Sequence, residues 1–386
     1  MECTKLYYTD PMLRQFTATV TGCTQTGKGW EVTLDATAFY PEGGGQACDL
    51  GTLGTVSVLD VRERDNTIVH LCDGPLPLGE AVAGIIDWNR RFDLMQQHTG
   101  EHILSGLIHR SFGYHNVGFH MGTGLMEVDF DGPITPEQLA ALEAEANAII
   151  WENRAVSCTV PSPEELTAIP YRSKKALDWP VRVVEVPGAD ICACCGVHVP
   201  TTGQVGLIKI FSCTPLRGGV RLEMACGNRA LRHLSAVWEQ NRQVSQVFSA
   251  KVLETGAAAQ RAADALAAEK LRANTLQTAL MDRIAGDYVN QNNVLHFTEG
   301  LDSAQLRTLA EKICAVCTGF CAVFSPREGG YSYCLAQPGG DLRRLCKAMN
   351  EALKGRGGGK PAFQQGTLSA DRQSIEDFFA KADVLL

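Results

Sequence analysis

Short runs in which apolar and polar residues alternate fill the first part of the chain. They lie at 18–21, 30–34, 56–61 and 67–71, with glycine, aspartate and other turn residues between them. Alternation with a period of two, in segments rich in valine, threonine and aromatic residues, is typical of strands that bury one face. The pattern predicts a small β-barrel over residues 1–88.

After residue 89 the apolar period changes to that of a helix. Helix-capping residues and alternating runs then mark further elements. The predicted elements are a helix over 91–111, a strand at 125–130, a helix capped by Thr135 and running to 153, and strands at 181–186 and 205–210. Together they predict an α+β domain over 89–227.

Alanine, leucine and charged residues dominate 228–290, which predicts a linker of two long helices with a break near Gly256. The apolar spacing is only approximately heptad, so a helical hairpin within one chain and a homodimer seam both fit it. The last segment, 291–386, predicts a small α/β domain. Its predicted elements are strands at 293–297, 320–325 and 331–336, helices over 303–316, 341–353 and 373–382, and a glycine loop at 355–361. The chain as a whole is predicted to be an α+β protein.

The composition indicates a globular protein. Of its residues 45% are apolar and 20% charged, and no apolar run is long enough to cross a bilayer, so we expect no membrane association. The first residues lack the basic and then apolar layout of a secretory signal, which favours the cytoplasm. The 15 cysteines are scattered, so we interpret most as reduced, buried thiols. Only clustered cysteines then indicate metal binding.

Two short clusters of metal-donor residues stand out. His98 and His102 are four residues apart in the predicted helix, so both imidazoles face the same side. Nearly a hundred residues later, Cys194 and His198 repeat that spacing, with a glycine between them that lets the backbone bend. Imidazole and thiolate are the ligands that zinc prefers, and four of them complete a tetrahedral site. The two clusters together predict one zinc site.

The source of the sulfur is left open by spacing alone, since Cys192, Cys194 and Cys195 lie close together. Cys314 and Cys317 also have the spacing of a metal or redox pair. They lie within an apolar helical pattern with no second pair nearby, so we interpret them as core packing.

The segment from His98 to His102 has a competing interpretation. It fits the H-x-x-E-H pattern of zinc peptidases, in which Glu101 would activate a water molecule. A peptidase of that kind wants a carboxylate as the third ligand and an open position. The cysteine and histidine offered here favour a structural site or one that acts on a bound substrate.

Two glycine-rich segments are candidates for ligand contact. Gly43, Gly44 and Gly45 lack side chains, which suits close approach of a ligand and equally suits a hairpin tip. Near the C-terminus, six basic and two acidic residues between positions 341 and 360 give a local charge of +4 in a chain whose net charge is −8. Such a patch is often a solvated helix face, but beside a flexible loop it also suits phosphate contact by Arg356 and Lys360.

Four motifs resemble the editing region of alanyl-tRNA synthetase in their order and spacing. They are Phe-Tyr-Pro-Glu-Gly-Gly-Gly-Gln at 39–46, His-Thr-Gly-Glu-His at 98–102, Asp190 with Cys-Cys-Gly-Val-His-Val at 194–199, and Gly-Val-Arg-Leu-Glu at 219–223. The chain is similar to the long form of the AlaX-type trans-editing proteins, which are free-standing relatives of that region. Its last segment resembles the DHH-associated domain that ends the synthetase.

The resemblance implies a Zn²⁺ site and a set of residues around it. The implied ligands are His98, His102, Cys194 and His198. It also implies that Gln46 and Thr37 lie beside the aminoacyl group, with Thr37 reading a serine hydroxyl. Cys195 and Val197 depart from the glycine and threonine usual in that motif, which leaves the ligands untouched but alters the pocket.

The function implied is hydrolysis of mischarged Ser-tRNA(Ala) or Gly-tRNA(Ala), with alanine tRNA as the partner. The short stretch before Thr37 leaves no room for an aminoacylation domain, so we expect deacylation without ligation. Two alternatives stay open, namely a zinc peptidase and a non-catalytic tRNA-binding protein with structural zinc. A homodimer through the helical or C-terminal region is also compatible with the sequence.

Overall fold

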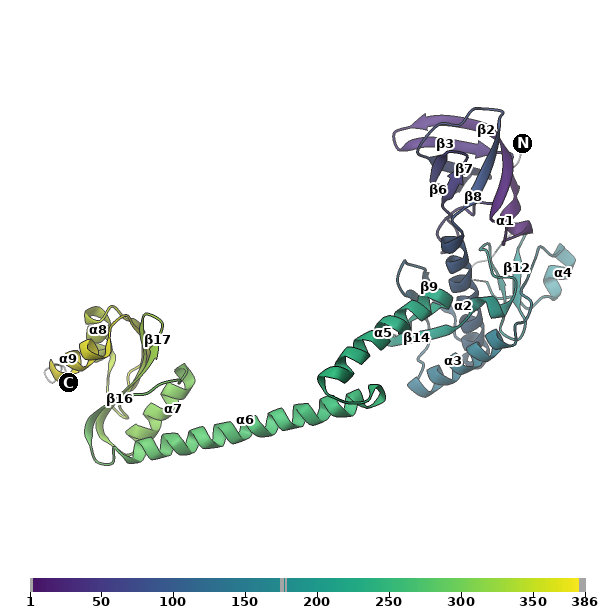
Figure 1. Cartoon of the computed structure of the whole chain (residues 1–386). Coiled ribbons are helices and arrows are strands. Elements are labelled where there is room, and N and C mark those ends of the chain that lie inside the picture. The colour runs from purple at the N-terminus through teal and green to yellow at the C-terminus, as the bar shows by residue number, and fades with distance from the viewer. Residues whose placement is uncertain (1–2, 174–176, 178, 382–386) are drawn as a thin grey trace. The chain divides into compact units, whose positions relative to one another are not determined.

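The computed structural model describes residues 3–173, 177 and 179–381, and the chain forms two compact units, Met1–Gln243 and Val244–Leu386. Each unit combines helices with β-sheet, so the predicted α+β class is confirmed (Figure 1). Within the described ranges, none of the helices is long and apolar enough to span a bilayer. The first two residues of the predicted barrel and Ala382, the predicted end of the last helix, lie outside these ranges.

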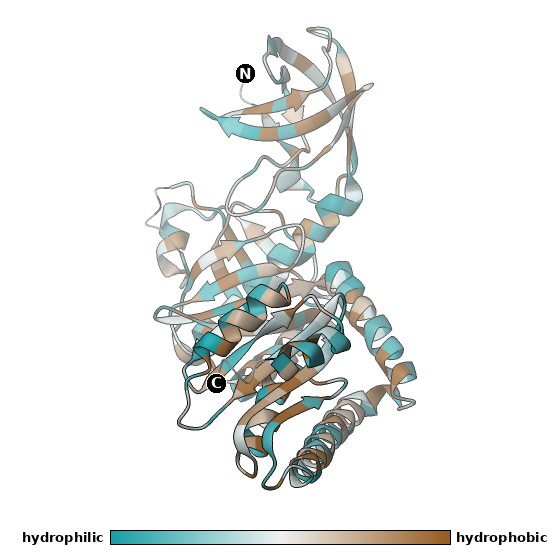
Figure 2. Ribbon diagram, turned by 90° about the vertical axis from the view of Figure 1, so that its left-hand side faces the viewer, coloured by the Kyte–Doolittle hydropathy of each residue, from teal (hydrophilic) through white to brown (hydrophobic). Residues whose placement is uncertain are grey.

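A six-stranded barrel begins the first unit, with neighbours in the order β2-β3-β7-β6-β5-β8 (Figure 1). Its strands are β2 (Gln15–Thr26), β3 (Gly29–Leu34), β5 (Gly51–Leu53), β6 (Val56–Arg64), β7 (Thr67–Cys72) and β8 (Ala81–Ile86). Buried and exposed residues alternate along β8, and Figure 2 shows hydrophobic and hydrophilic segments alternating along the barrel strands. Val32, Leu53 and Ile68 fill the interior without exposed surface. The apolar alternation predicted four of these strands but missed β5 and β8.

A parallel pair of very short strands joins the barrel to the segment that follows it. These are β1 (Thr4–Lys5) and β4 (Ala36–Thr37), with the short helix α1 (Leu6–Thr9) after β1. Beyond β4 the chain makes a tight hairpin in which Gly43 and Gln46 pair through both backbone hydrogen bonds. Gly44 and Gly45 form its tip with φ of +59° and +84°, conformations that favour glycine. The glycine run therefore forms a hairpin tip, which is one of its two interpretations from sequence.

The helix α2 (Trp88–Phe112) is the central element of the rest of the first unit. The Asp87 side chain accepts a hydrogen bond from the Arg90 amide at its N-terminus, and Gly113 ends it with φ of +74°. Most of its residues are buried because sheets and helices pack around it. The surrounding elements are β9 (Asn116–His120), β10 (Met126–Phe130), α3 (Pro136–Trp151), β11 (Ser157–Thr159), α4 (Pro163–Ala168), β12 (Val183–Val186), β13 (Asp190–Ala193), the 3₁₀-helix η1 (Thr202–Val205), β14 (Ile208–Leu216) and β15 (Gly219–Cys226).

These strands form two sheets, ordered β14-β15-β10-β9 and β11-β12-β13. The strand predicted at 205–210 is wrong in its first half, because the chain there ends a 3₁₀-helix and turns at Gly206 before β14 begins. Gly100 and Gly106 let these sheets approach α2. A Cβ on Gly106 would lie 2.3 Å from the Ala189 carbonyl oxygen, and one on Gly100 would lie 2.2 Å from Cys226 Sγ.

A buried ion pair fixes the barrel and its hairpin to the start of α2. Arg91 and Asp49 have no exposed side-chain surface, and Arg91 Nε lies 2.9 Å from both Asp49 carboxylate oxygens. Arg91 also donates to the Pro11 and Ala38 carbonyls, and the Tyr40 amide donates to Asp49. Breaking such a pair costs about 3–5 kcal/mol, because one charge is left buried without a partner. The hairpin is thereby held in place relative to α2.

Two helices follow β15, namely α5 (Gly227–Val247) and α6 (Thr255–Gly286), with a 3₁₀-turn η2 (Val252–Glu254) between them. The predicted pair of helices is present, but the break falls at 248–254 and Gly256 lies inside the first turn of α6. On α6 the large side chains of Leu266, Leu271, Leu276 and Leu280 are each more than half exposed. Whether the helices form a dimer stays a prediction.

The second unit contains a five-stranded sheet ordered β16-β17-β18-β20-β19. Its elements are β16 (Asn292–Phe297), α7 (Ser303–Cys314), β17 (Thr318–Arg327), β18 (Gly330–Ala336), α8 (Arg343–Ala352), β19 (Arg356–Lys360), β20 (Phe363–Leu368) and α9 (Arg372–Lys381). The predicted glycine loop is wrong, because Arg356–Lys360 is the edge strand β19, paired antiparallel with β20. Glycine has low strand propensity, yet a Cβ on Gly357 would lie 2.3 Å from the Gln365 carbonyl oxygen. The absent side chains therefore allow this close pairing.

Candidate metal centre

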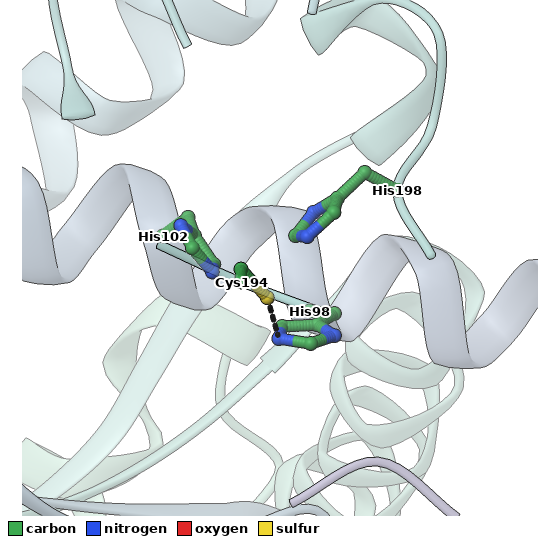
Figure 3. Close-up of side chains that lie close together, drawn as sticks. All are labelled: His98, His102, Cys194 and His198. Atoms are coloured by element: carbon green, nitrogen blue, oxygen red, sulfur yellow. Dashed lines mark hydrogen bonds between the residues drawn. The ribbon is translucent and has the colours of Figure 1, made fainter. Parts of the chain in front are cut away.

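Four donor side chains from distant parts of the sequence meet beside α2. His98 and His102 project from the helix, and Cys194 and His198 come from the loop after β13 (Figure 3). One ligand atom from each lies within 4.8 Å of the others. Tetrahedral zinc with bonds of about 2.0–2.3 Å places its donors about 3.5 Å apart. The distance from Cys194 Sγ to His98 Nε2, 3.4 Å, fits that spacing.

Each of the three imidazoles has its Nδ1 atom occupied by a neighbour outside the cluster. His98 Nδ1 lies 2.8 Å from Gln46 Oε1, His102 Nδ1 lies 2.9 Å from an Asp190 oxygen, and His198 Nδ1 lies 3.2 Å from Thr99 Oγ1. An Nδ1–H donated to such an acceptor leaves Nε2 with a lone pair for a metal. His198 Nε2 is buried and has no hydrogen-bond partner among the described residues. The site therefore presents three oriented imidazoles.

The charges of the cluster favour a cation. Burial raises the pKa of the Cys194 thiol, but His98 and His102 outweigh that effect and hold it well below its usual value. Burial lowers the pKa of His102, but Cys194 and then Asp190 raise it well above its usual value. Burial, helped by His98, lowers the pKa of His198 to about 3. The Cys194 thiolate and the neutral His198 are donors that zinc prefers, and a metal bound here would displace the proton held on His102.

The backbone around Cys194 is shaped to bring it against α2. Gly196 packs on His98, since a Cβ there would lie 2.0 Å from His98 Cε1. Arg182 donates to the carbonyls of Cys194 and Gly196 at 2.8 Å each. Cys195 is exposed, so the structure selects Cys194 from the neighbouring cysteines for the four-donor cluster. Cys192 lies in a second donor group with His102 and Asp190. The two groups overlap, because His102 belongs to both and Asp190 is its hydrogen-bond partner.

Gln46, the last residue of the glycine hairpin, reaches the cluster. Its Oε1 accepts hydrogen bonds from His98 Nδ1 and, at 3.2 Å, from the Val197 amide. Its Nε2 is buried and has no partner among the described residues. At the hairpin tip, a Cβ on Gly45 would lie 2.7 Å from the Phe119 ring, and that ring is centred 5.9 Å from the His98 ring. The exposed Gly44 and Gly45 thus lie close to the metal-donor cluster.

Thr37, the predicted reader of a serine hydroxyl, contacts residues outside the metal-donor cluster. Its side chain has no exposed surface, and its Oγ1 lies 2.9 Å from His70 Nε2 and accepts from the Phe39 amide at 3.1 Å. His70 Nδ1 lies 3.1 Å from the Val32 carbonyl oxygen, which can only accept, so Nδ1 carries the proton and Nε2 accepts from Thr37. The described partners of Thr37 therefore belong to the barrel. Its predicted place beside the aminoacyl group stays a prediction.

Glu101 lies on α2 between His98 and His102, but its carboxylate contacts residues outside the four-donor cluster. Its carboxylate accepts from Ser105 Oγ at 2.6 Å and from Asn116 Nδ2. It is buried and is not part of the four-donor group found among the described residues. The arrangement does not match a glutamate that activates water in a zinc peptidase.

Arg356 and Lys360, the predicted phosphate contacts, belong to the second unit. Both lie on the exposed edge strand β19, where positions two apart share a face. Gly358 stands between them, so their face of the strand is open. Their contact with nucleic acid stays a prediction.

Sequence reasoning did not give Asp190 a role and did not identify Arg172 at all. Arg172 donates to both Asp190 oxygens at 2.7 and 2.8 Å. Burial raises the pKa of Asp190, but His102 and Arg172 together lower it to about 2. The position of Asp190, four residues before Cys194, was the available signal. Arg172 gives none, because its partner is 18 residues away in the sequence.

Comparison with known proteins gives related sequences over most of the chain. Residues 181–222 match the family described as the threonyl and alanyl tRNA synthetase second additional domain. The alanyl-tRNA editing protein Aarsd1 of Mus musculus is 30% identical over 92% of this chain and 92% of its own length. The alanine–tRNA ligase of Ignicoccus hospitalis is 34% identical over 64% of this chain and 28% of its own length. That of Thermofilum pendens is 30% identical over 96% of this chain and 43% of its own length.

The chain spans less than half the length of these two ligases. A solved structure, the C-Ala domain of Aquifex aeolicus alanyl-tRNA synthetase, is 18% identical and covers 21% of this chain and 84% of that one, with a TM-score of 0.19 that supports no argument. The second additional domain and the two ligases show that the chain is related in sequence to the alanyl-tRNA synthetases. With a full-length relative at 30% identity, the chain belongs to the family of free-standing alanyl-tRNA editing proteins.

Proposed function

We propose that this protein hydrolyses the ester of mischarged alanine tRNA, Ser-tRNA(Ala) or Gly-tRNA(Ala), at a zinc site held by His98, His102, Cys194 and His198. The convergence of these four donors, with every imidazole Nδ1 held from outside the cluster, carries the proposal. Relatives named as alanyl-tRNA editing proteins support the substrate class.

The donor set fits zinc. One sulfur and three nitrogens match a structural or substrate-positioning tetrahedral site, and the buried His198 Nε2, without a partner among the described residues, is left for a metal. Bound zinc would supply a Lewis acid that polarises the ester carbonyl or a water molecule. Asp190, Gln46 and Thr99 orient the imidazoles, and such outer contacts contribute about 10- to 100-fold in metal affinity.

The glycine hairpin has the shape to admit the end of the tRNA. Gly44 and Gly45 expose backbone rather than side chains next to Phe119 and the donor cluster. Close approach of a ribose to this backbone needs the absence of a Cβ. Gln46 Nε2, which lacks a partner among the described residues, is the hydrogen-bond donor we assign to the aminoacyl ester. In this arrangement Gln46 orients His98 with its oxygen and the ester with its nitrogen.

Selection for serine over alanine needs a polar group that alanine cannot satisfy. A site that hydrogen-bonds a substrate hydroxyl rejects the analogue without it by about 10⁴-fold. Thr37 is assigned this part by the family resemblance. The Thr37 hydroxyl donates its hydrogen bond to His70, so its oxygen is an acceptor. That oxygen would accept a hydrogen bond from the serine hydroxyl. The buried position of Thr37 requires the serine side chain to reach into the barrel wall.

The specificity part of this proposal is tested by Thr37→Val. The change removes the acceptor at nearly constant volume, so kcat/KM should fall about 10-fold or more for Ser-tRNA(Ala) and stay unchanged for Gly-tRNA(Ala), which has no side chain. An equal fall for both substrates would show that Thr37 supports the fold rather than reading serine.

In the second unit, we assign Arg356 and Lys360 on β19 to contact with the tRNA backbone. The charge of +4 over positions 341–360 supports this assignment, because phosphate contacts need local positive charge. Their replacement by alanine should weaken tRNA binding without changing hydrolysis of a minimal substrate.

One assay separates the deacylase from its alternatives. The purified chain is incubated with Ser-tRNA(Ala) before chelation, after chelation and after zinc is restored, and the ester is followed. We expect release of serine that is lost on chelation and regained with zinc. A non-catalytic binding protein would leave the ester intact in every arm. A peptidase would cleave peptides and lose that activity with Glu101→Gln, whereas deacylation should survive this change if the variant folds.

A further inference from the structure

A cavity of about 560 Å³ opens in the first unit, close in sequence to residues of the candidate metal centre. Four segments line it: Ala47 just after the glycine hairpin, the N-terminal turns of α2, the loop before β10 that contains Met121, and the start of α5 with Asn228 and Arg232. Its volume is within the range of small-ligand sites. The four metal donors are not among its lining residues, so it is distinct from the metal centre.

The cavity carries excess positive charge. Arginines 90, 229 and 232 line it, with Asp93 as its acidic residue. Arg229 already has partners within the protein. It is buried, pairs with Asp93 and donates to the carbonyls of Gly122 and Gly124 at 2.6 and 2.8 Å. No ion pair among the described residues involves Arg90 or Arg232, and Arg232 is exposed. Arg90 donates from Nε to the Cys48 carbonyl at 3.0 Å, which is a neutral partner, so the charges of Arg90 and Arg232 are both left for an anionic ligand.

Further features of the lining suit a phosphate joined to a flat ring. The helices α2 and α5 both begin at the cavity, and the partial positive charge of a helix N-terminus adds to that of the arginines. Trp88 and Phe92 stack with ring centroids 5.6 Å apart, and both line the cavity while staying partly exposed. The Arg14 guanidinium lies over the Trp88 ring, 4.3 Å from its centroid, and adds a further positive charge beside the ring pair. Arginine together with exposed aromatic rings is the combination by which proteins bind single-stranded nucleic acid.

The cavity and the metal centre share two stretches of chain. Ala47, which lines the cavity, follows Gln46, whose oxygen lies 2.8 Å from His98 Nδ1. Met121, which also lines it, is two residues beyond Phe119, whose ring is centred 5.9 Å from that of His98. When the last sugar of a nucleic-acid chain lies at the metal centre, the nucleotides before it therefore have this basic cavity next to them.

We propose that this cavity binds the nucleotides that precede the terminal adenosine in the single-stranded 3′ end of the tRNA, with Arg90 and Arg232 on phosphate and the Trp88–Phe92 pair against a base. The proposal rests on the proposed deacylase function and names where that substrate extends. Buried Arg229 acts differently, because it ties the wall loop to α2 and α5 and so keeps the cavity open.

The test uses one ester on two carriers. Serine is attached either to adenosine alone or to the 3′ end of a minihelix that reproduces the alanine acceptor stem with its single-stranded end. In the full-length protein, Arg232→Ala should raise KM for the minihelix about 3- to 10-fold, the order of one lost phosphate contact, and lower the salt dependence of its binding. Hydrolysis of seryl-adenosine should not change.

Two matched variants serve as controls. Arg232→Lys keeps the charge and should retain most of the minihelix affinity. Arg217→Ala removes another exposed arginine, which forms no ion pair among the described residues and lies in the β14–β15 turn, so both substrates should behave as in the parent protein.

The outcomes separate the two proposals. If the parent protein hydrolyses both substrates and Arg232→Ala affects neither, or affects both equally, the cavity does not bind the preceding nucleotides. If the parent protein hydrolyses neither, the proposed function itself is wrong and the cavity inference goes with it. An effect on the minihelix alone that Arg217→Ala does not reproduce supports the inference.

Discussion

Two regions of this protein contain metal-donor side chains at four- or three-residue spacing, and they differ in what surrounds those side chains. In the first unit, His98, His102, Cys194 and His198 converge, and each imidazole has an outer partner. In the second unit, Cys314 lies at the end of α7 and donates from Sγ to the Ala336 carbonyl oxygen at 3.1 Å. Cys317, Cys321 and Cys334 lie near it, but none of these cysteines belongs to a metal-donor group found among the described residues.

The difference lies in the polar groups that the fold buries. The middle of α2 is buried and polar, with Gln96, Gln97, His98, Thr99, Glu101, His102 and Ser105. Around Cys314 the packing residues are apolar, including Leu309, Ile313 and Val323. Buried polar side chains cost free energy unless they are hydrogen-bonded, so a fold keeps them where they serve a purpose. Spacing alone does not distinguish the two regions, whereas the polar groups around the donors do.

Replacement of one cysteine in each region should break the comparison most sharply. Cys194→Ala removes a proposed metal ligand, so the variant should lose its bound metal. Because the metal is expected to stabilise the transition state by several kcal/mol, deacylation should fall about 10³-fold or more. Cys314→Ala removes a core thiol and should leave metal content and kcat unchanged. Metal analysis and deacylation of Ser-tRNA(Ala) check both variants, and equal effects of the two would contradict the distinction.

His70, a buried histidine outside the metal-donor cluster, should make the stability of the protein depend on pH. Burial lowers the pKa of His70 to about 4, from an ordinary value near 6.5. The unfolded chain therefore takes up a proton below about pH 6.5 that the folded chain refuses until about pH 4. Stability from the neutral His70 is present above pH 6.5, and about 3 kcal/mol of it is lost as the pH falls to 4.

The measurement is denaturant unfolding at pH 7 and at pH 4.5. His70→Gln cannot titrate, so its free energy of unfolding should fall less over this interval than that of the parent protein. The same fall in both proteins would mean that other groups govern the acid response.

The two regions should also differ in their tolerance of added bulk at glycine. A Cβ on Gly196 would lie 2.0 Å from His98 Cε1, so Gly196→Ala should displace that ligand and weaken metal binding about 10-fold or more. Gly256 in α6 meets nothing within 4 Å, so Gly256→Ala should raise the free energy of unfolding by about 0.5–1 kcal/mol through better helix propensity. Zinc titration and thermal unfolding measure these effects, and a tolerant Gly196 would mean that His98 is loosely held.

The sequence predicted the long periodic elements and the three histidine donors, because helical spacing and donor chemistry are local properties, whereas Cys194 was chosen from its neighbouring cysteines only by the family resemblance. It did not predict β19, where glycines pair at a sheet edge only because β20 lies opposite. It missed the part of Arg172, whose link to Asp190 depends on the path of the chain between them. The cavity between Trp88 and Arg232 joins residues more than a hundred positions apart, which no local pattern contains.

Zinc titration of the chelated protein, followed by deacylation of Ser-tRNA(Ala), tests the central claim most directly. We predict that activity is absent without metal, rises in proportion to added zinc and stops rising at one zinc per chain. Full activity in metal-free protein would contradict the assignment of the four donors to the editing site.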